Sequence, residues 1–295
     1  MFSNMVLQKI NFKLASSSDI KNMEGDSMKK IGIIGLGNMG EAILKALLTS
    51  HNSSWDISFH EIKKERAYFI EESYKIKNLH TIGDLVRYAD YIIVAVKPQD
   101  AKNTISELAP FMDDKKVIIS IMAGVKISNI ISIIGKPMKV IRAMPNICAK
   151  VGSAATGISA SREVDKDELK DAEYIFSCLG SVIEVGEDLM DAVTALGGSG
   201  PAFFLLFLEA MIDAGVKMGI PREKSKVMAI EVIKGTIKML EEEGLHPSIM
   251  REMVTSPGGT TIAGITHLEK KAFKGNIITA IEKAAKRAGE LSSWL

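Results

Sequence analysis

The chain of 295 residues is 46% apolar and 25% charged, which is enough to build two packed domains of ordinary size. Its 37 basic and 36 acidic residues nearly cancel, so no overall positive field exists to hold nucleic acid or an anionic membrane surface. The two cysteines, Cys148 and Cys178, lack the spacing of a metal site or of a disulfide framework, which indicates a reducing, cytoplasmic setting and no bound metal.

The amino-terminal segment, residues 1–27, is rich in Ser and Asn and shows no strong periodicity. A transit peptide would need arginine and an apolar face, so we expect a disordered extension or a start codon placed too early. The most apolar run, residues 202–218, is interrupted by Glu209, Asp213 and Lys217. It therefore falls short of the ~20 uninterrupted apolar residues of a membrane-spanning helix and predicts a core helix, with no membrane partner.

A dinucleotide-binding turn is predicted where the folded part begins. A β-branched run at residues 31–34 predicts a strand, and helical periodicity follows over residues 42–47. Between them lies G-L-G-N-M-G at residues 35–40. In this spacing the first glycine permits a tight turn, the second lets backbone approach a pyrophosphate, and the third lets helix pack on strand. The phosphates would lie at the helix amino terminus.

The nucleotide preference stays open because the residues after the second strand, predicted at residues 57–60, give conflicting signals. Glu61 lies about 20 residues beyond the last glycine of the turn, where an acid usually accepts the ribose hydroxyls of NAD. Lys63, Lys64 and Arg66 follow and could instead hold the 2′-phosphate of NADP, or only solvate the first turn of a helix. The cofactor is therefore expected to be NADP(H) or NAD(H).

Residues 89–98 are predicted to form a continuous apolar strand that ends at a proline, as in strands buried on both faces of a parallel sheet. In a doubly wound sheet, the loop beyond the carboxyl end of a strand lines the ligand crevice. We therefore expect residues 95–98 to pass beside the cofactor, and Lys97 to contact cofactor or substrate rather than only solvent.

Two further strands are predicted at residues 117–120 and 138–142, and helical stretches separate the strands as in βα alternation. The second of them runs into R-A-M-P-N at residues 142–146. We expect a loop near the nicotinamide there, with Asn146 as a contact. Plain turn chemistry is the alternative.

Beyond residue 193 the hydrophobic period becomes helical and predicts a separate all-α domain. Pro201 marks the first turn of a helix that is apolar almost all round, and such a helix must be buried in its own bundle or against a second subunit. Further helices are predicted at residues 221–243 and 274–291. Between these two, residues 254–264 carry the natural cap residues Thr255 and Ser256, the glycines at 258 and 259, and the threonines at 260 and 261, which would open a new helix. Such a helix start can hold a small carboxylate, although an ordinary capped connection is the alternative.

Five segments resemble the pyrroline-5-carboxylate reductase family and occur in the family's order. They are G-x-G-N-M-G at residues 35–40, A-V-K-P-Q at 95–99, R-A-M-P-N at 142–146, G-S-G-P-A at 198–202 and T-S-P-G-G-T-T at 255–261. The resemblance spans residues 30–291, and the last motif is the most specific. It implies an α/β Rossmann-type doubly wound parallel sheet over residues 28–190, followed by an all-α dimerisation domain over residues 191–295.

The same resemblance implies an activity, the last step of proline biosynthesis. A cyclic imino acid, 1-pyrroline-5-carboxylate, is reduced to L-proline by hydride transfer from NAD(P)H, in a homodimer or a larger homo-oligomer. The substrate-binding residues are then Ser256, Gly258, Gly259, Thr260 and Thr261, with Thr261 as the catalytic residue on the ring nitrogen. The cofactor-binding residues are Ile34, Gly35, Leu36, Gly37, Asn38, Met39, Glu61, Ala95, Val96, Lys97, Pro98 and Asn146.

Two positions depart from the family pattern. Gly197 stands where serine is common, and Ile82-Gly83 replaces an asparagine-containing stretch that can contact the adenosine phosphate in relatives. Together with Glu61, the second departure weakens the expectation of a strict NADPH preference.

A protonated cyclic imine is already electrophilic, so catalysis can rest mainly on placing the hydride against the imine carbon. Thr261 is then a donor that orients the nitrogen, or a proton relay, rather than a tuned general acid. Two alternatives remain. One is a β-hydroxyacid dehydrogenase, for which Lys217 and Lys234 are available as acids outside that family's signature; the other is a dinucleotide-sensing protein without catalysis.

Overall fold

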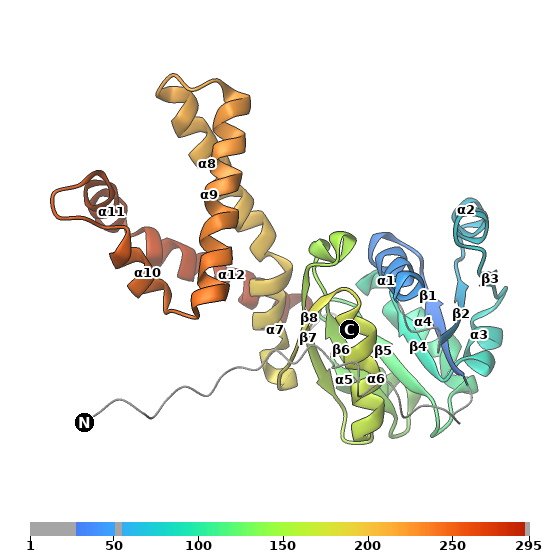
Figure 1. The fold of residues 1–295 in the computed structure, drawn as a ribbon. Helices are drawn as coiled ribbons and strands as arrows, with labels where there is room; N and C mark the ends of the chain where they lie inside the picture. Colours follow the sequence, from blue (N-terminus) through green and yellow to red (C-terminus); the bar gives the residue numbers. More distant parts are fainter. Residues whose placement is uncertain (1–27, 51–54, 293–295) are drawn as a thin grey trace.

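The computed structural model describes residues 28–50 and 55–292. In this part of the chain, a sheet with helices on both faces is followed by helices that project away from it (Figure 1). The extension predicted at residues 1–27 lies outside the described residues.

The sheet has eight strands in the order β3-β2-β1-β4-β5-β6-β7-β8, and all neighbours run parallel except β6 and β7. The strands are β1 (Lys29–Ile34), β2 (Trp55–His60), β3 (Lys77–Asn78), β4 (Tyr91–Val94), β5 (Val117–Ser120), β6 (Lys139–Met144), β7 (Ala154–Ala160) and β8 (Gly180–Glu184). The predicted doubly wound parallel sheet is confirmed. The predicted strand at residues 89–98 is shorter than expected, because the N–H of Ala89 still closes the preceding helix on the carbonyl of Leu85.

Helices cover both faces of the sheet because each strand sends alternate side chains to opposite faces. Ile31 and Ile33 of β1 pack on the side of α1, α2 and α6, whereas Ile92 and Val94 of β4 pack on the side of α3, α4 and α5. These helices are α1 (Asn38–Thr49), α2 (Lys64–Tyr74), α3 (Ile82–Tyr88), α4 (Ala101–Leu108), α5 (Ile127–Ile134) and α6 (Lys166–Ser177). The two cores hold the carboxyl ends of β1, β2 and β4 at one edge.

The carboxyl-terminal part is helical, as predicted. It contains α7 (Met190–Val193), a π-helical turn (Thr194–Gly198), α8 (Gly200–Lys217), α9 (Arg222–Glu243), α10 (Pro247–Met253), α11 (Thr260–Lys270) and α12 (Phe273–Ser292). The helices expected at residues 221–243 and 274–291 correspond to α9 and α12. Helices α8 and α9 form a hairpin that projects from the sheet domain, and α12 returns to pack on α7 and the π-helical turn (Figure 1).

A buried arginine joins the sheet to the helical part. Arg142 of β6 is almost fully buried, and its guanidinium lies 3.8 Å from a carboxylate oxygen of Glu187 and 3.6 Å from one of Asp191 in α7. Nη2 of Arg142 and Oδ1 of Asp191 are both buried and have no hydrogen-bond partner. The charge of each group is offset by the other at 3.6 Å. Glu187 also accepts a 2.6 Å hydrogen bond from the N–H of Ile127. These contacts fix α7 against the sheet.

We expect Arg142→Met to destabilise the fold by about 1–3 kcal/mol, because it leaves two partly buried carboxylates without a cation. The cost stays below that of a fully buried pair, since the carboxylates of Glu187 and Asp191 are about a third exposed. Urea denaturation would measure the change, with exposed Arg162→Met as the control. Adding Asp191→Asn to Arg142→Met should recover part of the loss, and strict additivity of the two would contradict the coupling.

Candidate active site

Residues 35–40 form the glycine loop, in which residues 35–37 join β1 to the first turn of α1 at the carboxyl ends of the strands. Its three glycines have separate geometric reasons. Gly35 has a φ of +90°, which favours glycine. A Cβ at Gly40 would lie 2.1 Å from the carbonyl oxygen of Gly35, so helix and loop could not pack. At Gly37 a Cβ would meet nothing within 4 Å. This open space at the amino terminus of α1 fits the pyrophosphate of a dinucleotide.

The segment of residues 95–98, predicted to pass beside the cofactor, begins next to this loop. It follows β4, whose Val94 pairs with Ile34 of β1, and the N–H of Ala95 donates to the carbonyl of Ile34 at 2.8 Å. The Gly35 turn packs closely on Ala95 and Val96, whereas Lys97 and Pro98 are exposed. The structure thus brings two of the predicted cofactor segments together at one edge.

Glu61 and Arg66 brace the glycine loop from the side of β2. The N–H of Leu36 donates to Glu61 Oε2 at 2.9 Å, and the N–H of Lys63 donates to Glu61 Oε1 at 3.0 Å. Nε of Arg66 donates to the carbonyl oxygen of Leu36 at 2.7 Å. Both backbone groups of Leu36 are therefore held by side chains from the β2–α2 connection.

The guanidinium of Arg66 has a second partner in Glu41 of α1, with which it forms an ion pair and a short hydrogen bond. The hydroxyl of Tyr74 also donates to Glu41, at 2.9 Å. Burial acts to raise the pKa of Glu41, but the hydrogen bonds from Arg66 and Tyr74 outweigh it and lower that pKa below its ordinary value. Glu41 is thus a carboxylate at neutral pH, and it keeps Arg66 in place.

Asn146 lies at the carboxyl end of β6, three strands from β1 in the sheet order and therefore roughly 14 Å away across the sheet. Its side chain is engaged at both ends: Nδ2 donates to the carbonyl of Gly197 at 3.1 Å, and Oδ1 accepts from the N–H of Cys148 at 3.1 Å. Asn146 therefore ties the end of β6 to the π-helical turn. A π-turn inside a helix often marks a functional site.

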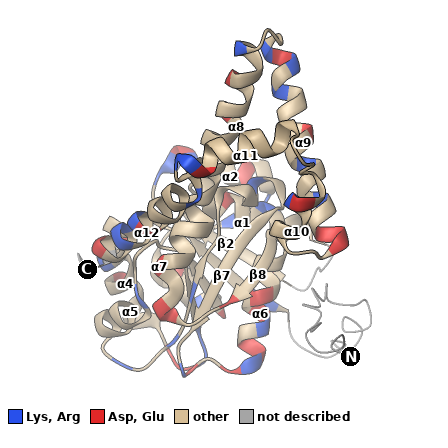
Figure 2. Cartoon of the chain, turned by 90° about the vertical axis from the view of Figure 1, so that its left-hand side faces the viewer, with Lys and Arg blue, Asp and Glu red and all other residues tan. Residues whose placement is uncertain are grey.

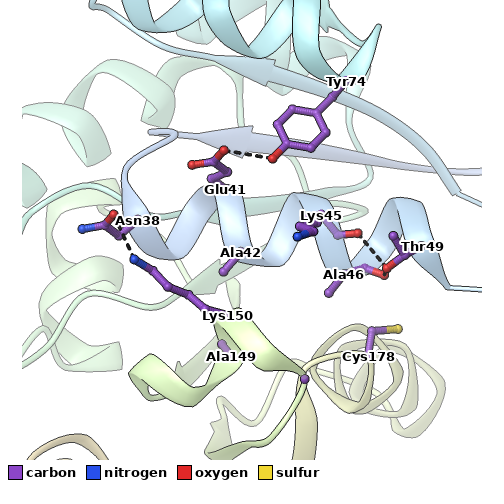
Figure 3. A pocket seen from close by; sticks show the side chains of 11 residues that line it. Asn38, Glu41, Ala42, Lys45, Ala46, Thr49, Tyr74, Ala149, Lys150 and Cys178 are labelled. Atoms are coloured by element: carbon purple, nitrogen blue, oxygen red, sulfur yellow. Dashed lines mark hydrogen bonds between the residues drawn. The ribbon is translucent and has the colours of Figure 1, made fainter.

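A groove of about 440 Å³ runs along the outer face of α1 (Figure 3). At one end Lys150 lies 3.4 Å from Oδ1 of Asn38, and at the other end Cys178 and Thr49 close the groove. Its Asn38 end borders the glycine loop. Among the described residues, no group of three His, Cys, Asp or Glu side chains is placed to hold a metal ion.

The segment of residues 255–261 connects α10 to α11. Helix α11 begins at Thr260, as expected, and Gly258 has a φ of +69°. The prediction that Thr255 and Ser256 cap this helix is wrong: the N-cap is Gly259, without a side-chain cap, and the hydroxyl of Thr255 bonds back to the carbonyl of Arg251. The helix start therefore stays available to an outside ligand.

The first backbone amides of α11 face outward without partners. The N–H of Gly259 donates to Ser256, and the helical ladder begins with Ala263. In the described part of the chain, the amides of Thr260, Thr261 and Ile262 thus have no acceptor, as is usual at a helix start. Three such donors at the positive end of a helix dipole can hold a carboxylate.

Within one chain, this helix start and the glycine loop do not meet. Figure 1 shows α11 at the far end of the helical part, separated from α1 by the α8–α9 hairpin and by several strands of the sheet. The π-helical turn that precedes α8 adjoins the sheet, where Gly198 lies close to the side chain of Met144. The two predicted halves of the site are therefore distant from each other in a single copy.

The helical part exposes a large apolar surface. Side chains of α8 such as Phe204, Leu205 and Leu206 are 45–68% exposed, and α9 adds Val227 and Met228. Charged residues gather towards the tip of the α8–α9 hairpin, while residues 200–208 carry none (Figure 2). So extensive an apolar surface indicates an interface.

The exposure of α8 decides between the two predicted ways to bury it. A bundle within its own chain is wrong for the described residues, because α8 packs mainly on α9 and most of its other faces stay exposed. The continuous helical run Glu187–Lys217 is also long and apolar enough to cross a membrane, although a single such helix is weak evidence of a span.

Comparisons with known proteins cover both halves of the chain. A family model described as pyrroline-5-carboxylate reductase dimerisation matches residues 187–291, and one described as NADP oxidoreductase, coenzyme F420-dependent, matches residues 30–124. The pyrroline-5-carboxylate reductase of Synechocystis sp. is 39% identical over 264 residues, which cover 89% of this chain and 98% of the relative.

Two solved structures show the same arrangement. The chain is similar to pyrroline carboxylate reductase of Plasmodium falciparum, solved with NADP bound, at 30% identity and a TM-score of 0.81, covering 91% of this chain and 100% of the other. It is also similar to the pyrroline-5-carboxylate reductase of Coxiella burnetii, at 32% identity and a TM-score of 0.84, covering 90% and 99%. The helical part is thus a dimerisation domain, and the chain is an NAD(P)-dependent oxidoreductase.

Proposed function

The chain belongs to the pyrroline-5-carboxylate reductase family, and we propose that it reduces 1-pyrroline-5-carboxylate to L-proline with NAD(P)H, acting on a CH–NH bond. One observation carries this proposal. The same chain offers an open dinucleotide edge at residues 35–40 and, on α11, three unpaired amides that fit the carboxylate of an imino acid.

We assign the cofactor to the carboxyl ends of β1, β2 and β4, where the glycine loop, Glu61 and the segment of residues 95–98 lie. We call this region the cofactor edge. Backbone of the glycine loop holds the pyrophosphate, with Glu61 on the ribose side and the segment of residues 95–98, which follows β4, beneath the nicotinamide half. When bound, the reduced nicotinamide supplies the hydride. The assigned residues are Ile34, Gly35, Leu36, Gly37, Asn38, Met39, Glu61, Ala95, Val96, Lys97, Pro98 and Asn146. Since the amide of Asn146 is already engaged, its part is to position the π-helical turn rather than to bind the nucleotide through a free amide.

The start of α11 is assigned to the substrate. Ser256, Gly258, Gly259 and Thr260 grip the carboxylate through backbone and the first amides of the helix, and the Thr261 hydroxyl bonds to the ring nitrogen. Because a protonated imine needs little further activation, these residues act mainly by orientation. The helix start also excludes water from the carboxylate side of the ring.

A second copy completes the site. The start of α11 lies far from the glycine loop of its own chain, and the exposed α8–α9 surface offers the area for association (Figure 1). We place α11 of one copy over the cofactor edge of the other in a homodimer, which can assemble further. A second copy rather than lipid covers α8, since the helix carries Glu209 and Asp213 and lies within the dimerisation match.

Two further assignments concern the location of the protein and its division into domains. The two cysteines of the described chain are free thiols, which supports a cytoplasmic location. We divide the chain into a dinucleotide domain over residues 28–190 and a dimerisation and substrate domain over residues 191–295. The family match beginning at residue 187 supports a boundary in this region.

The activity is tested by oxidation of NADH and of NADPH, followed at 340 nm, with 1-pyrroline-5-carboxylate against a set of 3-hydroxy acids with NAD(P)+. We expect turnover only with the imino acid. Turnover of a 3-hydroxy acid alone would instead support the β-hydroxyacid dehydrogenase alternative. That alternative has little support from its candidate lysines, because Lys234 is exposed and paired with Glu231 on its own helix.

The alternative of a dinucleotide sensor without catalysis predicts a different result for the reverse reaction, the oxidation of L-proline. The proposed enzyme should reduce NAD(P)+ in the presence of L-proline at alkaline pH, where release of the imine proton is favoured. A sensor binds the nucleotide tightly and yields no reduced product under these conditions. Nucleotide binding without proline-dependent reduction would therefore reject the enzyme.

A further inference from the structure

The carboxylate of Glu61 occupies a fixed position at the cofactor edge. Glu61 directly follows β2, which pairs with β1 through His60 and Ile34, so it lies one strand from the glycine loop. The amides of Leu36 and Lys63 each hold one of its oxygens, at 2.9 and 3.0 Å. A carboxylate held by backbone at both oxygens cannot swing away from an approaching ligand without losing both hydrogen bonds.

This position is the one next to the adenosine ribose. In a doubly wound sheet whose glycine loop follows β1, the ribose nearest that loop lies over the end of β2. An ionised carboxylate has about four acceptor sites, and the two amides take only two of them. Glu61 is half-buried, so the remaining sites can accept the 2′- and 3′-hydroxyls of the ribose.

The cations that could offset a 2′-phosphate are fewer than the sequence suggests. Of the basic residues that follow Glu61, the guanidinium of Arg66 is committed to the carbonyl of Leu36 and to Glu41. Only Lys63 and Lys64 remain, and both are exposed. Exposed ammonium groups are well hydrated and screened by salt, so each contributes little to a phosphate.

The first turn of α3, which approaches the same edge, adds no donor side chain. The side chain of Ile82 is buried, and Gly83 faces the ring of Phe111. The N-cap hydroxyl of Thr81 is already bonded to Asp84. A 2′-phosphate at this edge would therefore meet a fixed negative charge and two solvent-exposed positive ones.

From this balance we infer that the protein binds NADH in preference to NADPH, and that Glu61 is the residue that determines this specificity. The inference rests on the proposed function for the location of the cofactor, and it names the nucleotide that the site takes. Hydroxyls of NADH satisfy the free carboxylate sites, whereas the dianionic 2′-phosphate of NADPH is repelled by the same group.

Direct binding tests the inference without the imine substrate. Titration of the full-length wild-type protein with NADH and with NADPH, followed by nicotinamide fluorescence, should give at least a tenfold lower Kd for NADH. Glu61→Gln keeps an acceptor for the Leu36 amide but removes the charge, so it should shrink this ratio about tenfold, mainly through tighter NADPH binding. Glu65→Gln makes the same change on an exposed side chain of α2 and should leave the ratio unchanged.

The possible outcomes separate the inference from the proposed function. Equal or tighter binding of NADPH by the wild type, or an unchanged ratio in Glu61→Gln, overturns the inference while leaving the reductase proposal intact. If neither NADH nor NADPH binds, both the inference and the reductase proposal are overturned. If Lys63 and Lys64 govern recognition instead, NADPH affinity will fall steeply with added salt and Glu61→Gln will have no effect.

Discussion

Replacing Thr261 by alanine is expected to lower kcat for 1-pyrroline-5-carboxylate by about 100-fold or more, the usual contribution of a positioned proton donor or relay. The hydroxyl is the side-chain group nearest to the ring nitrogen in the proposed pose. Its loss leaves the imine free to rotate about its gripped carboxylate, away from the hydride. The affinity for NADH or NADPH should stay near normal, because Thr261 is assigned to the ring nitrogen of the imine and is not among the residues assigned to the nucleotide.

The structure makes this substitution a clean test. Thr261 forms no side-chain hydrogen bond in the described chain, so alanine leaves no partner unsatisfied, and alanine is the better helix former. Stopped-flow or steady-state assays should be paired with nucleotide titration and a thermal melt. Thr266→Ala on the same helix, which removes only a hydroxyl bonded to the Ile262 carbonyl, should behave as wild type.

A conservative substitution at Thr261 distinguishes a role of the hydroxyl group from a role of the side-chain volume. Thr261→Ser keeps the hydroxyl and should recover most of the lost turnover. Full activity of Thr261→Ala would remove this residue from the mechanism. A loss of nucleotide affinity in the same variant would instead show that the α11 assignment is wrong.

The sequence predicts most of the sheet because its strands are buried on both faces and are rich in β-branched residues. The runs that become β1, β4 and β5 show this pattern. The antiparallel pairing partner β7 escapes prediction because it consists of small residues, A-A-T-G-I-S-A. These small residues are needed for packing, since a Cβ at Gly157 would come within 2.5 Å of Val193 in α7.

Contacts of the candidate site can be predicted when they are local in the sequence and are missed when they join distant residues. The glycine loop is predictable because its constraints are local: Gly35 has a positive φ, and Gly40 leaves room for the carbonyl oxygen of Gly35. The brace on Leu36 is not, because Arg66 reaches a backbone oxygen 30 residues away and Glu61 a backbone amide 25 away. A basic cluster in sequence therefore suggested a phosphate site, whereas its guanidinium holds the loop.

The burial of the helical part cannot be explained within a single copy of the chain. Its sequence left two ways to bury α8 and did not decide between them. The described residues leave α8 exposed, and the dimerisation match over residues 187–291 indicates that a second copy covers it. The expectation of side-chain caps at Thr255 and Ser256 is wrong because the hydroxyl of Thr255 bonds back to α10 and the N-cap position is occupied by Gly259, which has no side chain.

Two inactive variants should restore activity in a mixed dimer if the site is built between copies. Gly37→Asp fills the open cradle of the glycine loop and places a negative charge against the pyrophosphate, while its φ of −69° and free surroundings spare the fold. Thr261→Ala disables the α11 side. Each homodimer should be inactive or nearly so, for different reasons.

In the mixed dimer, the cofactor edge of the Thr261→Ala chain faces the intact α11 of the Gly37→Asp chain. One of the two sites is then fully wild type, and the other carries both defects. Co-expression with two affinity tags and purification through both isolates this species. Its specific activity should be about half that of the wild-type dimer, by the symmetry of a two-fold interface.

The reciprocal pair supplies the matched control, with the opposite result. A dimer of wild type with a chain that carries both Gly37→Asp and Thr261→Ala has one defect in each shared site and should be nearly inactive. If each chain instead formed a site from its own glycine loop and its own α11, this second dimer would keep half the activity and the first would have none. The two mixed dimers carry the same two substitutions. A difference in their activity can therefore arise only from which chain contributes the glycine loop and which contributes α11 to each site.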